Sequence, residues 1–450
     1  MNRTYTTRSV PLPNRRTGST AKWNIILGAL GLILVIDQML LPMFHPFGIP
    51  FKPSYAILLV FPLFVIRTPV VLYTSGMRRR FWYLAAPVLW IAFWSVVGQF
   101  YLLAVEGIFD LSAIVTPIVT YVLMVLAIVL GQHVPQFKMQ WLLWILYSSI
   151  LLVLALALAA DRVPWLAQLW WKSEESIAYQ LAANEIRPTP FGDGSMVGTA
   201  LLFLFVVVAV RARYITLEKY HVVLATMLVI LTATVLVSRN QIVAVSIMAI
   251  ALMFGGSGSM RRKLLFLVVL ALVVLVITIF YGDVIRNEYP AVDRAIERLE
   301  NQDYLDFESD RQSETILRPL LNWERFWGRY LVSPIWGTGF SLGEVEPFAR
   351  LNFHNDWFHI WATSGMLGGI ALFVWMYRIY RELGLLILLP FFLPGLTNSF
   401  LLHVAGVIFY CFMLGVLVER KHLPRTTGNP PPELVGGQGM NRRYSLRSAR

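Results

Sequence analysis

The chain has 450 residues, of which 57% are hydrophobic and only 14% are charged. Soluble domains usually carry about 25% charged residues, so this composition excludes a soluble enzyme with one anchor and indicates a polytopic membrane protein. The formal net charge of +12 is what basic cytoplasmic loops give a membrane protein, and it gives little support to nucleic-acid binding. The single cysteine, Cys411, excludes an internal disulfide and a cysteine-based metal site.

Apolar runs recur along the chain at the length that a membrane-spanning helix needs, roughly 20 residues. The sequence therefore predicts an all-α protein with about 12 transmembrane helices. The expected spans are 23–44, 50–68, 81–103, 111–131, 140–160, 196–212, 217–237, 240–256, 263–281, 354–377, 382–395 and 398–418.

Lysine and arginine in the short connections set the expected orientation. They occur in alternate connections, which are therefore predicted to be cytoplasmic together with both basic termini. The residues concerned are Arg78, Arg79, Arg80, Lys138, Arg211, Arg213, Lys219, Arg261, Arg262, Lys263, Arg378 and Arg381. The expected parts are a cytoplasmic basic N-terminus at 1–22, transmembrane helices 1–9 at 23–281, a large periplasmic or extracellular loop at 282–353, transmembrane helices 10–12 at 354–418, and a disordered cytoplasmic tail at 419–450.

The large loop (282–353) contains eight arginines, thirteen acidic residues and no lysine. A helical pattern at 311–332 is predicted within it. Its apolar face comprises Ile316, Leu320, Trp323, Trp327 and Tyr330, and the opposite face carries Arg311, Arg318, Arg325 and Arg329. A solvated face on a helix along the membrane explains this stripe. The absence of lysine favours a phosphate site instead, because guanidinium groups bind phosphate oxygens bidentately.

Two further arginines and one histidine are candidates. Arg239 stands between two apolar runs at their outer end, where it either snorkels to the headgroups or has a function. Arg187, before the sixth span, is weak evidence alone. His354 ends the large loop and begins a span. Because histidine titrates near neutrality, His354 can take a proton from a hydroxyl; a hydrogen-bonded capping histidine is the alternative.

The residues after His354 bear on metal binding and on packing. His354 and His359 are five residues apart, so they do not share a helix face as a zinc-binding i, i+4 pair would. Gly365 and Gly368 lie one helical turn apart, and small residues at that spacing let neighbouring helices approach closely in lipid. We therefore expect a packing role for the glycines and no metal site.

At this point the residues resemble a known family. His354-Asn355, nine residues and Gly365-Met-Leu-Gly368 resemble the His-Asn-x9-Gly-x-x-Gly signature of bacterial O-antigen ligases and Wzy-type polysaccharide polymerases. The stretch from Trp323 through Ser333-Pro-Ile-Trp-Gly-Thr-Gly339 is similar to the family's Arg…Trp…Pro-x-x-Gly-x-Gly stretch.

Two shorter segments extend the resemblance to roughly residues 180–375. Ser238-Arg239 is similar to the family's Ser-Arg turn, and the segment 187–193 resembles its Arg…Gly-x-Phe…Asn segment. There are departures from the family pattern. The sequence at 193–195 is Asp-Gly-Ser where the family has Pro-Asn. The spacing of the arginine before Trp323 differs by about one residue, so the matching arginine is Arg318 or another arginine of the loop, and Arg318 is taken as the best match.

The resemblance implies a GT-C-like, metal-independent membrane glycosyltransferase without a cofactor, in the bacterial plasma membrane. The implied donor is a glycan on undecaprenyl diphosphate; the acceptor hydroxyl belongs to lipid A–core of lipopolysaccharide in ligases, or to another lipid-linked glycan, O-antigen or exopolysaccharide, in polymerases. His354 is the expected general base. The expected diphosphate-binding residues are Arg239, Arg318 and Arg187, and the structural motif comprises Asn355, Gly365, Gly368, Gly337 and Gly339.

The alternative function is a transporter or flippase of a lipid-linked glycan. Transporters tend to show inverted repeats and charged or broken helices at mid-membrane. In this sequence the conspicuous polar groups gather at the outer face, and Asp37 alone is expected deep within a span. This pattern favours the enzyme.

Overall fold

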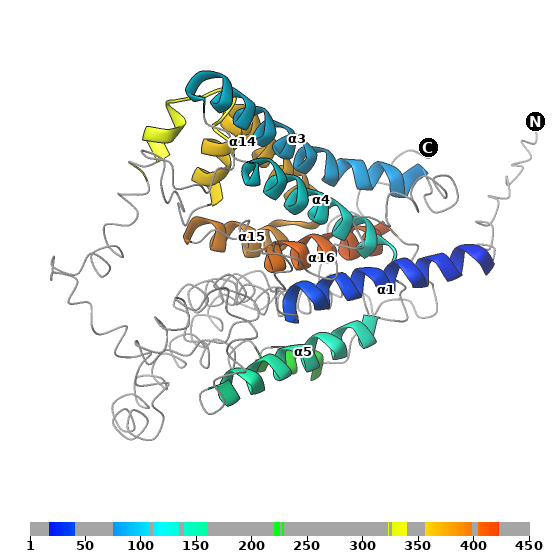
Figure 1. The fold of residues 1–450 in the computed structure, drawn as a ribbon. Helices are drawn as coiled ribbons and strands as arrows, with labels where there is room; N and C mark the ends of the chain where they lie inside the picture. The colour runs from blue at the N-terminus through cyan, green and yellow to red at the C-terminus, as the bar shows by residue number, and fades with distance from the viewer. Residues whose placement is uncertain are drawn as a thin grey trace, which may run out of the picture.

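The computed structural model describes residues 18–40, 75–107, 111–134, 139–160, 220–225, 227–228, 323, 326–339, 356–397 and 404–422. Within these ranges every regular element is a helix. The long helices are α1 (Gly18–Leu40), α3 (Ser75–Glu106), α4 (Ser112–Gln132), α5 (Met139–Ala160), α14 (Asp356–Leu383), α15 (Leu385–Thr397) and α16 (Val404–His422). They lie roughly side by side as a bundle (Figure 1).

Each of these helices overlaps a predicted span, so the helical prediction is confirmed for this part of the chain. Two of them are long and apolar enough to cross a membrane, over Gly76–Glu106 in α3 and Trp357–Leu383 in α14. The expected spans at 50–68, 196–212, 240–256 and 263–281 lie outside the described residues. The span at 217–237 is helical in the two short pieces that the structure describes.

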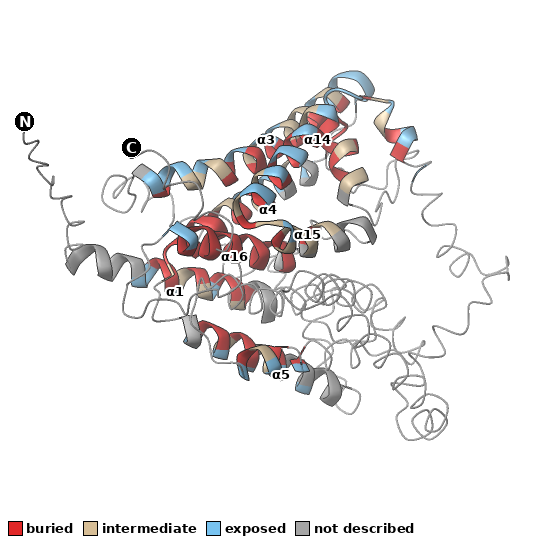
Figure 2. Ribbon diagram, turned by 180° about the vertical axis from the view of Figure 1, so that it is seen from behind, coloured by how far each residue is buried: buried red, intermediate tan, exposed pale blue. Residues whose placement is uncertain are grey.

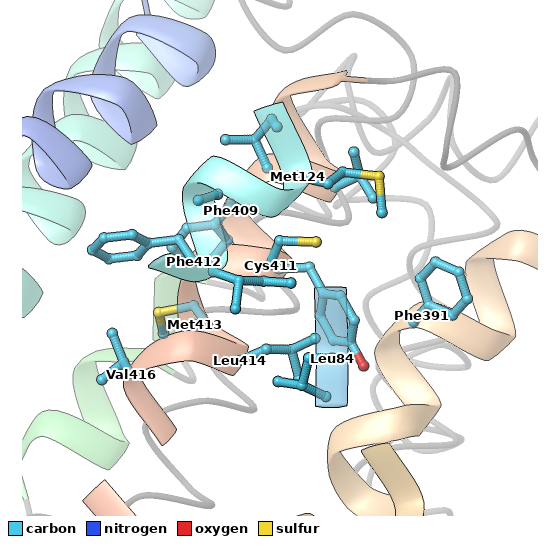
Figure 3. Close-up of a cluster of buried hydrophobic side chains, with 14 of the residues drawn as sticks. Leu84, Met124, Phe391, Phe409, Cys411, Phe412, Met413, Leu414 and Val416 are labelled. Carbon is cyan, nitrogen blue, oxygen red and sulfur yellow. The ribbon is translucent and has the colours of Figure 1, made fainter. Parts of the chain in front are cut away.

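The core of the bundle is built around α16. All its side chains between 406 and 418 are buried, as expected for a helix that is apolar on every side. Figure 3 shows residues of α16 meeting Leu84 of α3, Met124 of α4 and Phe391 of α15. In α3 and α14 buried and exposed residues alternate along the helices (Figure 2), so each of these helices has one face in the bundle.

Glycines allow α4 and α16 to cross at close range. A Cβ on Gly131 of α4 would overlap the carbonyl oxygen of Phe412, and a Cβ on Gly415 of α16 would overlap that of Ile128. Small residues at helix crossings let backbones approach closely, which is a main source of packing energy between helices in lipid. These contacts fix α16 against α4.

Basic residues gather at one end of the bundle. The Arg80 guanidinium lies 2.6 Å from the Glu419 carboxylate, and Arg378 donates a hydrogen bond of 2.7 Å to the carbonyl oxygen of Tyr83. Glu382 pairs there with Lys421 at 3.3 Å and with His422. Arg80 and Arg378 belong to connections that the sequence predicts to be cytoplasmic, so residues from two such connections lie at the same end.

Candidate functional site: a glycine segment in a broken helix

The helix α14 is broken at Gly365, where φ is 62° and ψ is −167°. Glycine reaches this left-handed region without the steric penalty that a Cβ brings. In an unbroken helix the carbonyl oxygens of Ala362 and Thr363 would accept hydrogen bonds from the residues four positions later. The break removes those partners. The first half of the helix, 356–364, therefore ends with carbonyl oxygens that need hydrogen-bond donors from outside the helix.

The Pro-x-x-Gly-x-Gly stretch supplies the missing partners. We call residues 333–339 the glycine segment. The backbone N–H of Thr338 donates to Ala362 O at 3.0 Å, and that of Gly339 donates to Thr363 O at 2.9 Å. In the other direction, Met366 donates to Pro334 O at 2.8 Å. Backbone polar groups that are buried away from water need a hydrogen-bond partner, and here the two segments satisfy each other.

The close approach of these segments explains why glycines stand at the contact. Gly337 and Gly339 have φ values of 79° and 74°, a region that side chains rarely enter. A Cβ on Gly337 would lie 2.5 Å from the backbone nitrogen of Gly365, and a Cβ on Gly339 would lie 2.5 Å from Oε1 of Gln99. The motif therefore specifies a backbone-to-backbone junction.

Helix α3 packs against both segments of this junction. A Cβ on Gly98 would lie 2.7 Å from the backbone nitrogen of Gly339 and 2.8 Å from Thr363 O. The neighbouring Gln99 is fully buried, and its side-chain amide has no hydrogen-bond partner within the described residues. One turn earlier, Trp94 packs on Trp336 with ring centroids 5.1 Å apart. Sequence analysis did not identify Gly98 and Gln99; a Gly-Gln pair within an apolar span is the signal that marks them.

The glycines of α14 differ from the expected helix-to-helix contact. The close neighbour of Gly365 is the glycine segment, because a Cβ there would overlap Ile335 O. Gly368 lies against the side chain of Ser364 in its own helix and reaches Trp94 of α3 only at 3.9 Å. Gly369 lies against the indole of Trp361. Because the helix is broken, side chains of its first half occupy the space beside these glycines.

Arg329 is the buried cation of the site. Its side chain is on the helical turn at 326–330, and the residue is only 2% exposed. Nε donates to Thr338 Oγ1 at 2.5 Å and Nη2 donates to Gly339 O at 2.8 Å. Thr338 Oγ1 in turn donates to Ala362 O at 3.2 Å. Burial lowers the pKa of Arg329 to about 10, so the guanidinium remains charged at neutral pH.

The predicted arginine stripe is wrong at Arg329. Helical periodicity predicted that Arg329 lies on the face opposite the apolar residues Trp323 and Trp327. In the structure Phe326 and Arg329 are buried, whereas Trp323 is 49% and Trp327 is 38% exposed. The physical reason is that the polar partners of Arg329 lie in the glycine segment, so its charge is satisfied inside the protein.

Aromatic residues line the same half-helix. Phe326 stacks on Phe358 of α14 with ring centroids 4.7 Å apart. The ring centroids of Tyr330 and Trp361 are 6.2 Å apart. A cavity of about 330 Å³ adjoins this stack. It is lined by Phe326, Trp357, Phe358, Trp361, Phe373 and Phe392.

The structure brings together three of the glycines that the sequence singled out, Gly337, Gly339 and Gly365, whereas Gly368 lies against Ser364 of its own helix. His354 and Asn355 directly precede Asp356, the first residue of α14, and both lie outside the described residues. So do Arg187, Arg239 and Arg318. Among the residues that the structure describes, no three His, Cys, Asp or Glu side chains group as a metal site.

The family comparison falls on the same part of the chain. Residues 222–373, about a third of the chain, match the O-antigen ligase family. No curated protein matches the chain. The matched segment begins before Arg239 and includes Arg318, His354 and the whole junction between the glycine segment and α14; Arg187 lies outside it. Residues 222–373 of the chain therefore match an O-antigen ligase domain, and the predicted resemblance to the O-antigen ligase and Wzy-type family is confirmed over this segment.

Proposed function

We propose that this protein transfers a glycan from undecaprenyl diphosphate to an acceptor hydroxyl at the outer face of the bacterial plasma membrane. The acceptor is lipid A–core if the protein is a ligase, or a second lipid-linked glycan if it is a polymerase. The observation that carries the proposal is the match of residues 222–373 to the O-antigen ligase family. The junction in α14 supports it, since the glycines of both family motifs meet there.

In the proposed reaction, neutral His354 removes the proton of the acceptor hydroxyl. The acceptor oxygen attacks the anomeric carbon of the donor glycan and forms the new glycosidic bond. The bond from that carbon to the diphosphate breaks, and undecaprenyl diphosphate leaves with the electron pair. The imidazolium of His354 then releases its proton to water.

Arginines are proposed to stabilise the leaving group. Arg239 and Arg318 neutralise the charge that develops on the diphosphate, and Arg187 assists. Guanidinium groups suit this role because they stay protonated and contact two phosphate oxygens at once. In this mechanism the residues themselves supply the base and the charge, so transfer proceeds without a metal ion or cofactor.

The proposed membrane arrangement has both termini in the cytoplasm, about 12 spans in a GT-C-like bundle, and a large outer loop at 282–353 with short helices. The end of the bundle that carries Arg80 and Arg378 is assigned to the cytoplasm. Since α3 runs from Arg80 toward Gln99, the glycine segment then lies near the outer face. Support comes from two helices with the length and apolarity of a span.

The decisive variant is His354→Ala in the full-length chain, compared with the parent at equal protein level. We expect transfer to be lost. Full transfer by His354→Ala would contradict the assignment. Arg239→Ala and Arg318→Ala are expected to lower transfer without abolishing folding, because they act on the leaving group.

Deletion of the gene followed by glycan analysis separates the remaining classes. Long lipid-linked chains that are no longer attached to an acceptor indicate a ligase. Single repeat units indicate a polymerase. Intermediates trapped inside the cell, with chain length and attachment otherwise normal, favour a transporter or flippase and would overturn the proposal.

A further inference from the structure

We propose that Arg329 is a positioning residue for this transfer reaction: through Thr338 and the glycine segment, it holds the first half of α14 (356–364) in the orientation that places His354. This inference rests on the proposed function, in which His354 is the base. Arg329 does not contact the substrate in this account. It acts through the backbone that precedes and follows the break at Gly365.

The break makes such a device necessary. In a continuous helix, the second half of α14 would fix the direction of the first half through the ladder of backbone hydrogen bonds. At Gly365 that ladder stops, and the partners of Ala362 O and Thr363 O come from the glycine segment. The glycine segment therefore helps to set the direction of 356–364, in addition to the packing of Trp357 on Phe391 and Phe392.

Arg329 fixes that segment at two points. Its Nε and Nη2 atoms bind Thr338 Oγ1 at 2.5 Å and Gly339 O at 2.8 Å. The N–H groups of the same two residues donate to the carbonyl oxygens at the end of the half-helix. The Thr338 hydroxyl also donates to Ala362 O, at 3.2 Å, which makes three hydrogen bonds between the two segments. The planar guanidinium holds both partners in one geometry, which a single ammonium group cannot do.

The helical turn that carries Arg329 also packs along the half-helix. Phe326 stacks on Phe358 at 4.7 Å, only two positions into α14 from Asp356. One face of 356–364 is thus held by Phe326 and its end is held by the glycine segment. His354 stands two residues before Asp356, so a rotation of this half-helix would move the base relative to the acceptor.

Energetics argue against a purely structural arginine. Taking a guanidinium out of water is expensive, and replacing buried ionic groups by well-packed apolar side chains is often neutral or stabilising. A residue that is 2% exposed and that serves only packing would be better as leucine or methionine. The charge is explained if fixed geometry at the junction matters for the reaction.

The test compares Thr338→Val, Arg329→Gln and Thr338→Ser in the full-length protein in membranes. The donor is the lipid-linked glycan extracted from a strain that lacks the gene, and kcat is calculated per folded protein. Thr338→Val keeps the shape of the side chain but loses the hydroxyl. We expect it to lower kcat by about 100-fold, the effect of a misplacement of about 1 Å, with KM for the donor unchanged.

Arg329→Gln should give the same loss of kcat, and the double variant should be no worse than the lower single variant because both act through one chain of contacts. Thr338→Ser, which restores a hydroxyl, should recover most of kcat. The control is Gly328→Ala beside Arg329, where an added Cβ meets no atom within 4 Å among the described residues; its kcat should equal that of the parent.

A parent-like kcat in folded Thr338→Val would overturn the positioning role, as would a rise in KM alone. If Arg329→Gln fails to accumulate, Thr338→Val decides the question. His354→Ala is measured in parallel. Transfer retained by His354→Ala refutes the proposed function itself, whereas an inactive His354→Ala beside a fully active Thr338→Val refutes only the role of Arg329.

Discussion

Gly337 and Gly365 lie back to back, each with a positive φ, of 79° and 62°. A Cβ on Gly337 would come within 2.5 Å of the nitrogen of Gly365. The two residues belong to two separate motifs of the sequence, and the structure shows that these motifs form one junction. The first half of α14 is thereby tied to the glycine segment, and the junction becomes the part of the protein where small changes should have large effects.

Gly365→Ala should destabilise the protein strongly. Alanine at this φ and ψ, a region that is essentially restricted to glycine, costs about 1–3 kcal/mol in strain, and the overlap with Ile335 O adds about 1–3 kcal/mol. The apparent melting temperature of the purified protein in detergent measures the loss. We expect transfer activity per folded protein to fall as well, because the break no longer fits the glycine segment.

Gly384→Ala is the matched control for this variant. Gly384 has a φ of 89°, but an added Cβ there meets no atom within 4 Å in the described part of the chain. Gly384→Ala therefore reports backbone strain alone, about 1–3 kcal/mol. Equal destabilisation by the two substitutions would show that the junction contributes nothing beyond the φ of Gly365.

The helices were the most predictable part of this protein. Long apolar runs locate α4 and α5 to within one residue at each end, because a span must be apolar over a fixed length, and they locate α3 although that helix begins six residues earlier than predicted. The glycines were predictable as a motif but not as a junction. Contact between Gly337 and Gly365 depends on a tertiary approach of two segments, and hydropathy carries no information about which segments meet.

Arg329 shows a second limit of prediction from the sequence. Helical periodicity assigned it to the face opposite Trp323 and Trp327, since charge is normally outside. Its partners, the Thr338 hydroxyl and Gly339 O, lie nine and ten residues later in the glycine segment, so burial costs less than the pattern suggests. Gln99 was missed for a similar reason: one amide lowers the mean hydropathy of a long apolar span only slightly, and its neighbour Gly339 is distant in sequence.

Gly98→Ala should destabilise by about 1–3 kcal/mol, the usual cost of overpacking. The added Cβ would lie 2.7 Å from the nitrogen of Gly339 and 2.8 Å from Thr363 O, and neither backbone atom can move without breaking the junction. Gly328→Ala should instead stabilise the protein. Its Cβ is unobstructed and alanine favours the helical turn by up to about 1 kcal/mol. A melting temperature of Gly98→Ala that equals or exceeds that of the parent would contradict the geometry at Gly98.

Phe326→Ala should cost about 3–5 kcal/mol, as for other buried phenylalanines. The ring is 6% exposed and stacks on Phe358, so its loss leaves a gap beside the first half of α14. Trp327→Ala, at 38% exposed, should cost clearly less although tryptophan is larger. If the melting temperature falls more for Trp327→Ala, the helical turn faces α14 with its other side, as the sequence periodicity suggested.

The orientation of α3 can be tested by cysteine labelling, because the native Cys411 is buried and should not react. Gly76 and Glu106 are exposed residues at opposite ends of α3. With the basic end in the cytoplasm, Glu106→Cys should react with a membrane-impermeant maleimide in right-side-out vesicles, and Gly76→Cys only in inverted vesicles. The reverse pattern would place Gly98, and with it the glycine segment, toward the cytoplasm, where a donor presented at the outer face does not reach it. Labelling of both residues from one side would show that α3 does not cross the membrane.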